Sequence, residues 1–109
     1  MAGAGELIGS AIVRRLRDQG FSRVMGVAEE ELDLTDAAQV EAVFSRIAPE
    51  YVFLTAGKAA GTGTQQRYPA DLLRDNLLVE CEVIHAVYRH RVKKLLYLAS
   101  SCSYTKQCV

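Results

Sequence analysis

Several features that would point to particular classes of protein are scarce or absent in this chain of 109 residues. It has no tryptophan, two prolines, two histidines and three cysteines. Three cysteines cannot all pair, and Cys81, Cys102 and Cys108 form no CxxC motif, so we expect free thiols and no metal site. Free thiols are typical of a reducing compartment, and a cytoplasmic location is the expectation.

The chain also has a net charge of zero at neutral pH. Thirteen Lys and Arg balance thirteen Asp and Glu, which removes the usual electrostatic argument for nucleic acid or an anionic membrane as a partner. No apolar run approaches the roughly 18 residues that cross a bilayer, and the first residues show no basic-then-apolar signal pattern. We therefore expect a soluble protein with no nucleic-acid and no membrane partner.

The composition is that of a globular protein. Apolar residues make up 50% of the chain and charged residues 24%. The length allows one small domain with a modest core, and it is too short for most complete α/β enzymes.

Helix-like and strand-like segments alternate along the chain. Gly20 marks the end of the first helix, and Asp36 and Gln39 resemble a capping box at the start of the second. The expected helices cover residues 7–19, 37–48 and 69–89, and the expected strands cover residues 23–27, 51–55 and 95–99. Strands separated by helices imply right-handed crossovers and a parallel sheet. The sequence thus predicts a three-layer, Rossmann-like α/β fold.

The beginning of this fold is expected to be truncated. Only Met1 and Ala2 precede the glycine-rich turn, where a whole first strand would ordinarily stand. That strand belongs at the centre of the sheet, so we expect the centre to be unpaired on one side, which invites association with other chains.

The longest expected helix, residues 69–89, carries two apolar stripes. One consists of Leu73, Leu77, Cys81, Ile84 and Tyr88, and the other of Leu72, Val79, Val83 and Ala86. Two stripes predict burial on two sides, one against the sheet and one against a neighbouring helix or a second subunit. Cys81 is expected to be a core residue.

Three glycines precede the first helix. Gly3, Gly5 and Gly9 would let the backbone approach a pyrophosphate at a helix N-terminus, although their spacing is GxGxxxG rather than GxGxxG. An ordinary glycine-rich turn is the alternative. Glu29 stands near the ribose position, where a carboxylate favours NAD over NADP; a solvated acidic turn explains it equally well.

Longer segments of the chain resemble the GDP-L-fucose synthase family. These enzymes are extended short-chain dehydrogenases/reductases of the NAD-dependent epimerase/dehydratase type. The resemblance covers almost the whole chain, and its most specific parts are Tyr-Pro-Ala-Asp and Ser-Ser-Cys. The segments are Ala2–Gly3, Gly9–Leu16, Glu31–Asp36, Leu54–Lys58, Tyr68–Asp71, Lys94–Leu98 and Ser100–Lys106.

The resemblance implies an NADP(H)-dependent conversion of GDP-4-keto-6-deoxy-mannose to GDP-L-fucose, by epimerisation followed by reduction. It places the glycine loop (Gly3, Gly5 and Gly9) at the pyrophosphate, Asp33 and Leu34 near the adenine, and Ala56, Gly57 and Lys58 along the cofactor. It implies that Ser100 hydrogen-bonds the keto oxygen and that Cys102 transfers protons during epimerisation. A small residue at a strand exit remains the alternative for Cys102, and a loop-stabilising hydroxyl is the alternative for Ser100.

Two departures from the family pattern bear on function. Gly5 and Glu29 stand where the family has arginines that contact the 2′-phosphate of NADP, so the choice between NADP and NAD stays open. None of the five tyrosines has a lysine four residues later, so the Tyr-x-x-x-Lys pair that protonates the keto oxygen is absent. We therefore expect residues 1–109 to be a partial NAD(P)-binding Rossmann domain without a substrate domain, inactive by itself.

Two other hypotheses remain. The chain could be a small interaction protein that forms a homodimer, or docks on a relative, through helix 69–89. It could also be a bare dinucleotide-binding module that a separate chain completes with its own Tyr-x-x-x-Lys motif. The nucleotide-sugar partner that the family implies would have most of its site outside this chain.

Overall fold

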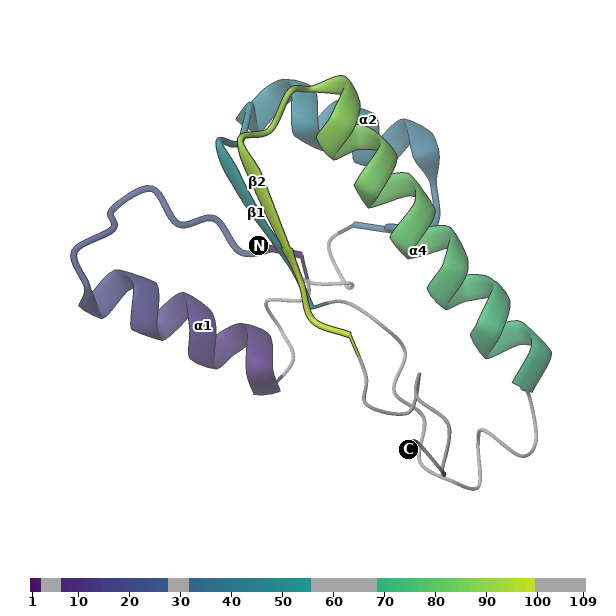
Figure 1. The fold of residues 1–109 in the computed structure, drawn as a ribbon, viewed down its shortest axis with the longest axis horizontal. Coiled ribbons are helices and arrows are strands. Elements are labelled where there is room, and N and C mark those ends of the chain that lie inside the picture. The colour runs from purple at the N-terminus through teal and green to yellow at the C-terminus, as the bar shows by residue number, and fades with distance from the viewer. Residues whose placement is uncertain (3–6, 28–31, 56–68, 100–109) are drawn as a thin grey trace, which may run out of the picture.

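The computed structural model describes residues 1–2, 7–27, 32–55 and 69–99 (Figure 1). Within these residues lie three helices and two strands, in the expected order except that the strand predicted between the first two helices is missing. They are α1 (Leu7–Asp18), α2 (Ala37–Ile47), β1 (Tyr51–Leu54), α4 (Pro69–Arg89) and β2 (Lys94–Tyr97). Helices α1 and α2 and strand β1 end one residue earlier than expected, and the last strand lies one to two residues earlier.

The sheet is parallel, as predicted. Strands β1 and β2 pair in the register Tyr51 to Lys94 through Leu54 to Tyr97. Ala2 adds a third position, because it bridges Leu54 on one side and Val27 on the other, both in parallel. The backbone order across the sheet is therefore Val27, Ala2, β1 and β2.

We expected the centre of the sheet to be unpaired on one side, and this was wrong at Ala2, whose backbone pairs on both sides. The Ala2 amide donates to Phe53 O at 2.9 Å, and Ala2 O accepts from the Thr55 amide at 3.0 Å. On the other side, the Val27 amide donates to Met1 O at 2.8 Å. Two residues suffice here because each peptide group of an inner strand can bond to a different neighbour.

The predicted strand over residues 23–27 was also wrong. Only Val27 forms a bridge, and residues 21–26 belong to no helix or strand. A strand exists only where a neighbouring backbone pairs with it, and Met1 and Ala2 offer a partner for the end of this segment alone.

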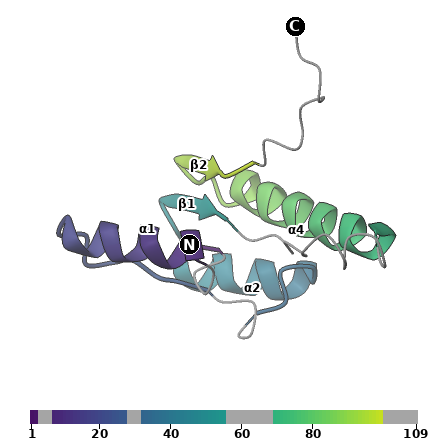
Figure 2. The ribbon, with the colours of Figure 1, turned by 90° about the horizontal axis from the view of Figure 1, so that it is seen from below.

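The helices form layers on the two faces of the sheet. Helix α1 lies on one side of the strands, and α2 and α4 lie on the other (Figures 1 and 2). The connection from Ala2 to Val27 runs in one direction across the sheet, and the connections from Val27 to β1 and from β1 to β2 run in the other. Because all crossovers between parallel strands are right-handed, connections that run in opposite directions put their helices on opposite faces of the sheet. The three-layer prediction is thus confirmed.

The core fills the space between the sheet and the layer of α2 and α4. Its most fully buried side chains are Leu54 of β1, Val40 of α2 and Val83 of α4. Val52, Phe44, Val79, Ala86, Leu32, Leu34 and Ala2 complete the cluster. Strand β1 and helices α2 and α4 thus contribute their apolar faces to one continuous core, whereas the buried Val13 of α1 lies outside this cluster.

The two apolar stripes of α4 differ in burial. Val79, Val83 and Ala86 are buried, whereas Leu73, Leu77, Ile84 and Tyr88 are 62%, 49%, 44% and 80% exposed. Cys81, expected in the core, is exposed as well. The prediction of burial against the sheet is confirmed for one stripe, and the other stripe stays on the surface of this chain.

A polar contact joins the middle of α2 to the C-terminal end of α4. Glu41 of α2 lies 3.0 Å from His90 Nε2 and 3.6 Å from the Arg89 guanidinium, and the His90 ring packs against Phe44 at a centroid distance of 5.6 Å. His90 thus has a structural position, as the sequence suggested, while His85 is exposed.

Candidate cofactor site

The carboxyl ends of the parallel strands meet at one edge of the sheet. Ala2, Val27, Leu54 and Tyr97 mark this edge, because their pairings put them at the same level. In open parallel sheets, ligands bind at this edge, in the crevice where crossovers leave in opposite directions. Here the connection after Ala2 goes one way and the connection after Leu54 goes the other.

Most of the predicted site residues follow these strand ends directly in the sequence. Gly3 and Gly5 follow Ala2, Ala56–Lys58 follow Thr55, and Ser100 and Cys102 come soon after β2. These residues, together with Glu29, lie outside the part of the chain that the structure describes. Gly9, Asp33 and Leu34 lie within it.

Gly9 is buried in the first turn of α1. The described residues of this turn, Leu7 to Gly9, include no acid. The free amide groups and the positive end of the helix dipole at such a terminus favour an anion. Thr55 ties β1 to the entry of this turn, because both its amide and its hydroxyl donate to Ala2 O, at 3.0 and 2.9 Å.

A set of local hydrogen bonds shapes the chain between Asp33 and α2. Asp33 Oδ1 accepts from the Thr35 amide at 2.9 Å and from its hydroxyl at 2.6 Å. Asp36 caps α2 by accepting from the amides of Ala38 (2.9 Å) and Gln39 (3.4 Å). The expected capping pair is thus present.

The Gln39 side chain joins the two halves of this turn. Its Nε2 donates to Asp36 Oδ2 at 3.1 Å, and its Oε1 accepts from the Asp33 amide at 3.1 Å. In a capping box this side chain would reach back to the amide of the cap residue itself. Here it reaches three residues further, which ties the position of Asp33 to the start of α2.

Asp33 and Leu34 line a cavity of about 470 Å³. The opposite wall comes from the N-terminal half of α4. The lining consists of Leu32, Asp33, Leu34, Thr35, Arg74, Asp75, Asn76 and Val79. Leu34 is 5% exposed and offers a small apolar wall, while Asp33 offers a carboxylate that can accept hydrogen bonds.

The polar residues on the α4 wall did not emerge from the sequence as site residues. Arg74 and Asp75 pair with each other at 3.1 Å, and Asn76 follows them. These three residues, between Leu73 and Leu77, form the longest polar run within α4, and this run was the available signal.

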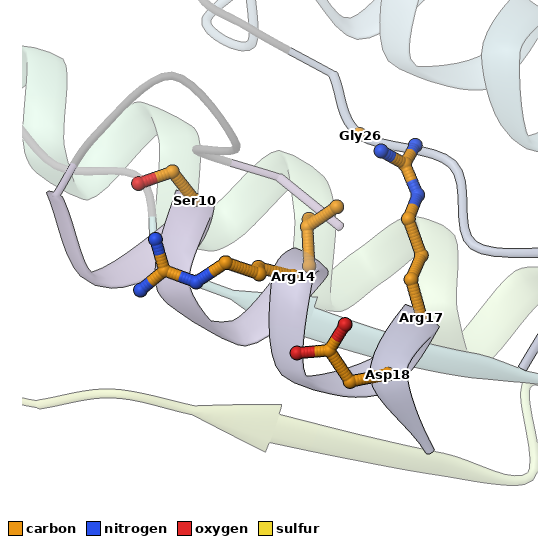
Figure 3. Close-up of a pocket in the computed structure, with 6 residues that line it drawn as sticks. Ser10, Arg14, Arg17, Asp18 and Gly26 are labelled. Atoms are coloured by element: carbon orange, nitrogen blue, oxygen red, sulfur yellow. The ribbon is translucent and has the colours of Figure 1, made fainter. Parts of the chain in front are cut away.

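A second cavity, of about 480 Å³, lies beside α1 (Figure 3). Ser10, Val13, Arg14, Arg17 and Asp18 of α1 line it together with Gly26. Gly26 immediately precedes Val27, so this cavity lies next to the residue that pairs with Ala2.

Tyr97, the last residue of β2, forms a hydrogen bond to α4 that depends on the ionisation state of its hydroxyl. Its hydroxyl donates to Glu80 Oε1 of α4. This hydrogen bond raises the pKa of Tyr97, with smaller contributions from partial burial and from the Glu80 charge. Tyr97 is therefore neutral over the physiological range.

Residues 1–2, 7–27, 32–55 and 69–99 contain no metal-binding cluster and no membrane-spanning helix. No group of three or more His, Cys, Asp or Glu residues there could hold a metal ion. Across the same residues, no helix has the length and apolar character needed to span a bilayer.

Several known proteins are similar to this chain in sequence or in fold. The GDP-L-fucose synthase 1 of Arabidopsis thaliana is 49% identical over 97% of this chain and 33% of its own length. Among solved structures, the protein DdhaC matches with a TM-score of 0.94 at 44% identity, over 99% of this chain and 31% of its own. A GDP-D-glycero-L-gluco-heptose synthase of Campylobacter jejuni, determined in the presence of NADPH, matches with a TM-score of 0.92 at 33% identity, over 99% and 32%.

The chain spans about a third of the length of the curated relatives that it matches. The sequence model of the "NAD dependent epimerase/dehydratase family" matches residues 1–108. Parallel sheet, strand-end cavity and sequence similarity all agree, and this chain belongs to the NAD dependent epimerase/dehydratase family.

Proposed function

We propose that this chain is the dinucleotide-binding part of a GDP-L-fucose synthase-like epimerase-reductase. The cofactor is NADP(H) or NAD(H), and the substrate of the complete reaction is a GDP-linked 4-keto-6-deoxy sugar. The observation that carries the proposal is the cavity that brings Asp33 and Leu34 together with α4 beside the carboxyl ends of the strands. Similarity to GDP-L-fucose synthases favours this function over that of a small interaction protein.

The chemistry of the residues fits a dinucleotide. The Asp33 carboxylate can accept a hydrogen bond from the exocyclic amine of adenine, and Leu34 supplies apolar surface at the ring edge. The amides at the start of α1 suit the pyrophosphate, with Gly3, Gly5 and Gly9 allowing close approach. We assign Ala56, Gly57 and Lys58 to the nicotinamide side, because they follow β1 at the same edge.

The chemical step needs more than this chain contains. When bound, the cofactor supplies the hydride that reduces the keto carbon. Ser100 would donate a hydrogen bond to the keto oxygen, and the Cys102 thiol would exchange protons with the sugar during epimerisation, since a thiol pKa can be tuned to working pH. Without a Tyr-x-x-x-Lys pair, we expect the chain by itself to bind cofactor and not to reduce the sugar.

An exposed free thiol, Cys81, suits the reducing cytoplasm as its compartment.

The test is a titration of the purified chain with NADPH and NADH, followed by the emission of the nicotinamide ring. We expect a dissociation constant below about 100 µM, equivalent to about −5.5 kcal/mol. A cooperative melt, recorded first, establishes that the chain is folded. A folded chain that binds neither cofactor would refute the proposal.

The Asp33→Asn variant tests the adenine assignment. Asparagine can still accept hydrogen bonds from Thr35, but it carries no negative charge and presents a donor that repels the adenine amine. We expect binding to weaken about three- to tenfold with little change in the melting temperature. Asp71→Asn, in the exposed first turn of α4 outside the cavity, is the matched control and should bind like the unmodified chain.

We propose a second copy of this chain as the partner of the exposed α4 stripe. Leu73, Leu77, Cys81, Ile84 and Tyr88 form a continuous apolar row along the helix. Cys81 stands near the middle of the row, so an antiparallel pairing of two α4 helices would match the row with itself. Such a self-complementary patch is what a two-fold interface requires.

Light scattering after gel filtration tests this pairing. We expect a dimer for the unmodified chain and a monomer for Leu77→Glu, because a buried unpaired carboxylate opposes association. Ile8→Glu changes an equally exposed residue on α1 and should leave the dimer intact. Mild oxidation should link the two Cys81 thiols of the dimer. A monomeric unmodified chain, or dissociation by both variants, would contradict the assignment.

A further inference from the structure

One backbone carbonyl at the carboxyl edge of the sheet accepts two hydrogen bonds from a single residue. Ala2 O accepts from the Thr55 amide at 3.0 Å and from the Thr55 hydroxyl at 2.9 Å. The amide bond continues the pairing of Ala2 with β1, since the Ala2 amide donates to Phe53 O at 2.9 Å. The hydroxyl bond is an addition to this pairing, because strands pair through their backbones alone. It comes from a part-buried side chain 53 residues away in the sequence.

The two bonds fix the direction of the Ala2 carbonyl. A carbonyl oxygen has two lone pairs, and a single donor leaves the peptide plane some freedom to tilt. Donors at two positions on the same residue restrict that tilt. Because a peptide group is planar, a carbonyl that is held in place also sets the direction in which the chain continues. Ala2 is the last described residue before the glycine loop, so Thr55 orients the entry to this loop.

Thr55 also precedes a second group of proposed cofactor residues. It is the first residue after β1, and Ala56, Gly57 and Lys58 follow it directly in the sequence. One hydroxyl therefore connects the start of the segment assigned to the pyrophosphate with the start of the segment assigned to the nicotinamide. A change at this hydroxyl reaches cofactor binding without any contact to the cofactor.

We propose that the Thr55 hydroxyl is a positioning group for the dinucleotide, which holds the glycine loop in the geometry that its amides need to bind a pyrophosphate. This inference rests on the proposed dinucleotide site. In this role the hydroxyl acts through Ala2 O. A loop that is held in its binding geometry before the ligand arrives loses less conformational entropy on binding, and the ligand binds more tightly as a result.

Thr55→Val separates this positioning role from a structural one. Valine keeps the branched shape and the strand preference of threonine and removes the hydroxyl. Ala2 O keeps its bond from the amide of residue 55, so the substitution leaves no unpaired carbonyl at this point of the sheet. We therefore expect the melting temperature to change by less than about 4 °C.

Two ligands that differ by the pyrophosphate alone, ADP and adenosine, are the probes. Their affinities for the full chain are measured by NMR titration. For Thr55→Val we expect the affinity for ADP to fall about three- to tenfold, with the affinity for adenosine unchanged. NADPH should follow ADP, because it contains the same pyrophosphate. Thr55→Ser keeps a hydroxyl at the same position and should bind ADP within about twofold of the unmodified chain.

Thr35→Val is the matched control, because it makes the same substitution at a hydroxyl of the proposed adenine cavity. The Thr35 hydroxyl donates to Asp33 Oδ1 at 2.6 Å, and both residues line this cavity. Its removal should weaken adenosine and ADP by the same factor, since both ligands contain the adenine. The two valine variants therefore differ in which part of the ligand loses affinity.

The outcomes separate the inference from the function on which it rests. Equal losses of ADP and adenosine affinity in Thr55→Val would overturn the positioning role and leave the dinucleotide site standing. So would unchanged ADP binding in Thr55→Val, or an equal loss of ADP affinity in Thr55→Ser. A large fall in the melting temperature of Thr55→Val would show a structural role and contradict the inference as well. A folded, unmodified chain that binds neither ADP nor NADPH would overturn both the inference and the proposed function.

Discussion

Replacement of Asp36 by alanine tests how the start of α2 is linked to the fold and to the adenine cavity. Asp36 accepts hydrogen bonds from the amides of Ala38 and Gln39 and from the Gln39 side chain. Alanine removes all three hydrogen bonds and leaves two amides of the first turn without a side-chain partner. Loss of an N-cap costs about 1 kcal/mol, within a range of about 0.5–2.

That free energy is large for this chain. Helix α2 contributes Val40 and Phe44, which are 2% and 7% exposed, to the only core cluster found in the described residues, so fraying of its first turn loosens the packing of the whole layer. For a domain of this size, about 1 kcal/mol lowers the melting temperature by about 4–8 °C. The effect is well above the reproducibility of a thermal melt.

The assay is urea and thermal unfolding followed by circular dichroism. Asp36→Asn is the matched control, because asparagine caps helices about as well as aspartate and should stay within a few tenths of a kcal/mol. Gln39 also accepts from the Asp33 amide, so Asp36→Ala should weaken NADPH binding as well. Equal melting temperatures for Asp36→Ala and Asp36→Asn would refute the reasoning.

Three further predictions follow from the described structure. Ala48, the exposed C-cap of α2, has φ 45°, and Ala48→Gly should stabilise the chain by about 0.5–1 kcal/mol, seen as a higher urea midpoint, because relief of left-handed strain exceeds the backbone entropy of glycine; a lower midpoint would contradict this. The pKa of Tyr97 is raised by its hydrogen bond to Glu80, so the stability from this contact is present below pH 10 and is lost as the pH rises through the folded-state value. The midpoint difference between the unmodified chain and Tyr97→Phe should therefore shrink above pH 10, and a difference that stays constant to pH 11.5 would exclude the contact. Leu54 is fully buried, and Leu54→Ala should cost about 2–5 kcal/mol, whereas Leu7→Ala, at an 87% exposed residue of α1, should change the unfolding free energy by less than about 0.5.

The local structure of the chain follows from its sequence to a large extent. The bounds of α4 agree with the predicted helix at both ends, and Asp36 caps α2 as predicted, although the Gln39 side chain bonds the Asp36 carboxylate and the Asp33 amide rather than the Asp36 amide. Capping and helical periodicity depend on residues within four positions of each other, so the sequence contains all the partners. The parallel sheet follows from the order of the elements, because a helix between two strands returns the chain to the end of the sheet where the first strand began.

Pairing and burial required the tertiary structure. A run of strand-forming residues at 23–27 met a partner only at Val27, and Ala2 found partners on both sides, because a strand depends on backbone that is distant in sequence. Which α4 stripe is buried was likewise undecided, since two apolar stripes have the same periodicity and differ only in what packs against them.

The candidate site likewise combines residues that the sequence predicted with groupings that only the tertiary structure shows. Sequence resemblance identified Asp33 and Leu34 as cofactor residues, and this assignment remains a prediction for the titration to test. Their grouping with Arg74, Asp75 and Asn76 into one cavity arises only when α4 packs across the sheet edge. The cavity lined by Arg14 and Arg17 exists only because Gly26 returns beside α1. Residue chemistry was thus set by the sequence alone, whereas the tertiary structure decided which chemistries meet, because contacts between distant segments are not encoded in any local pattern.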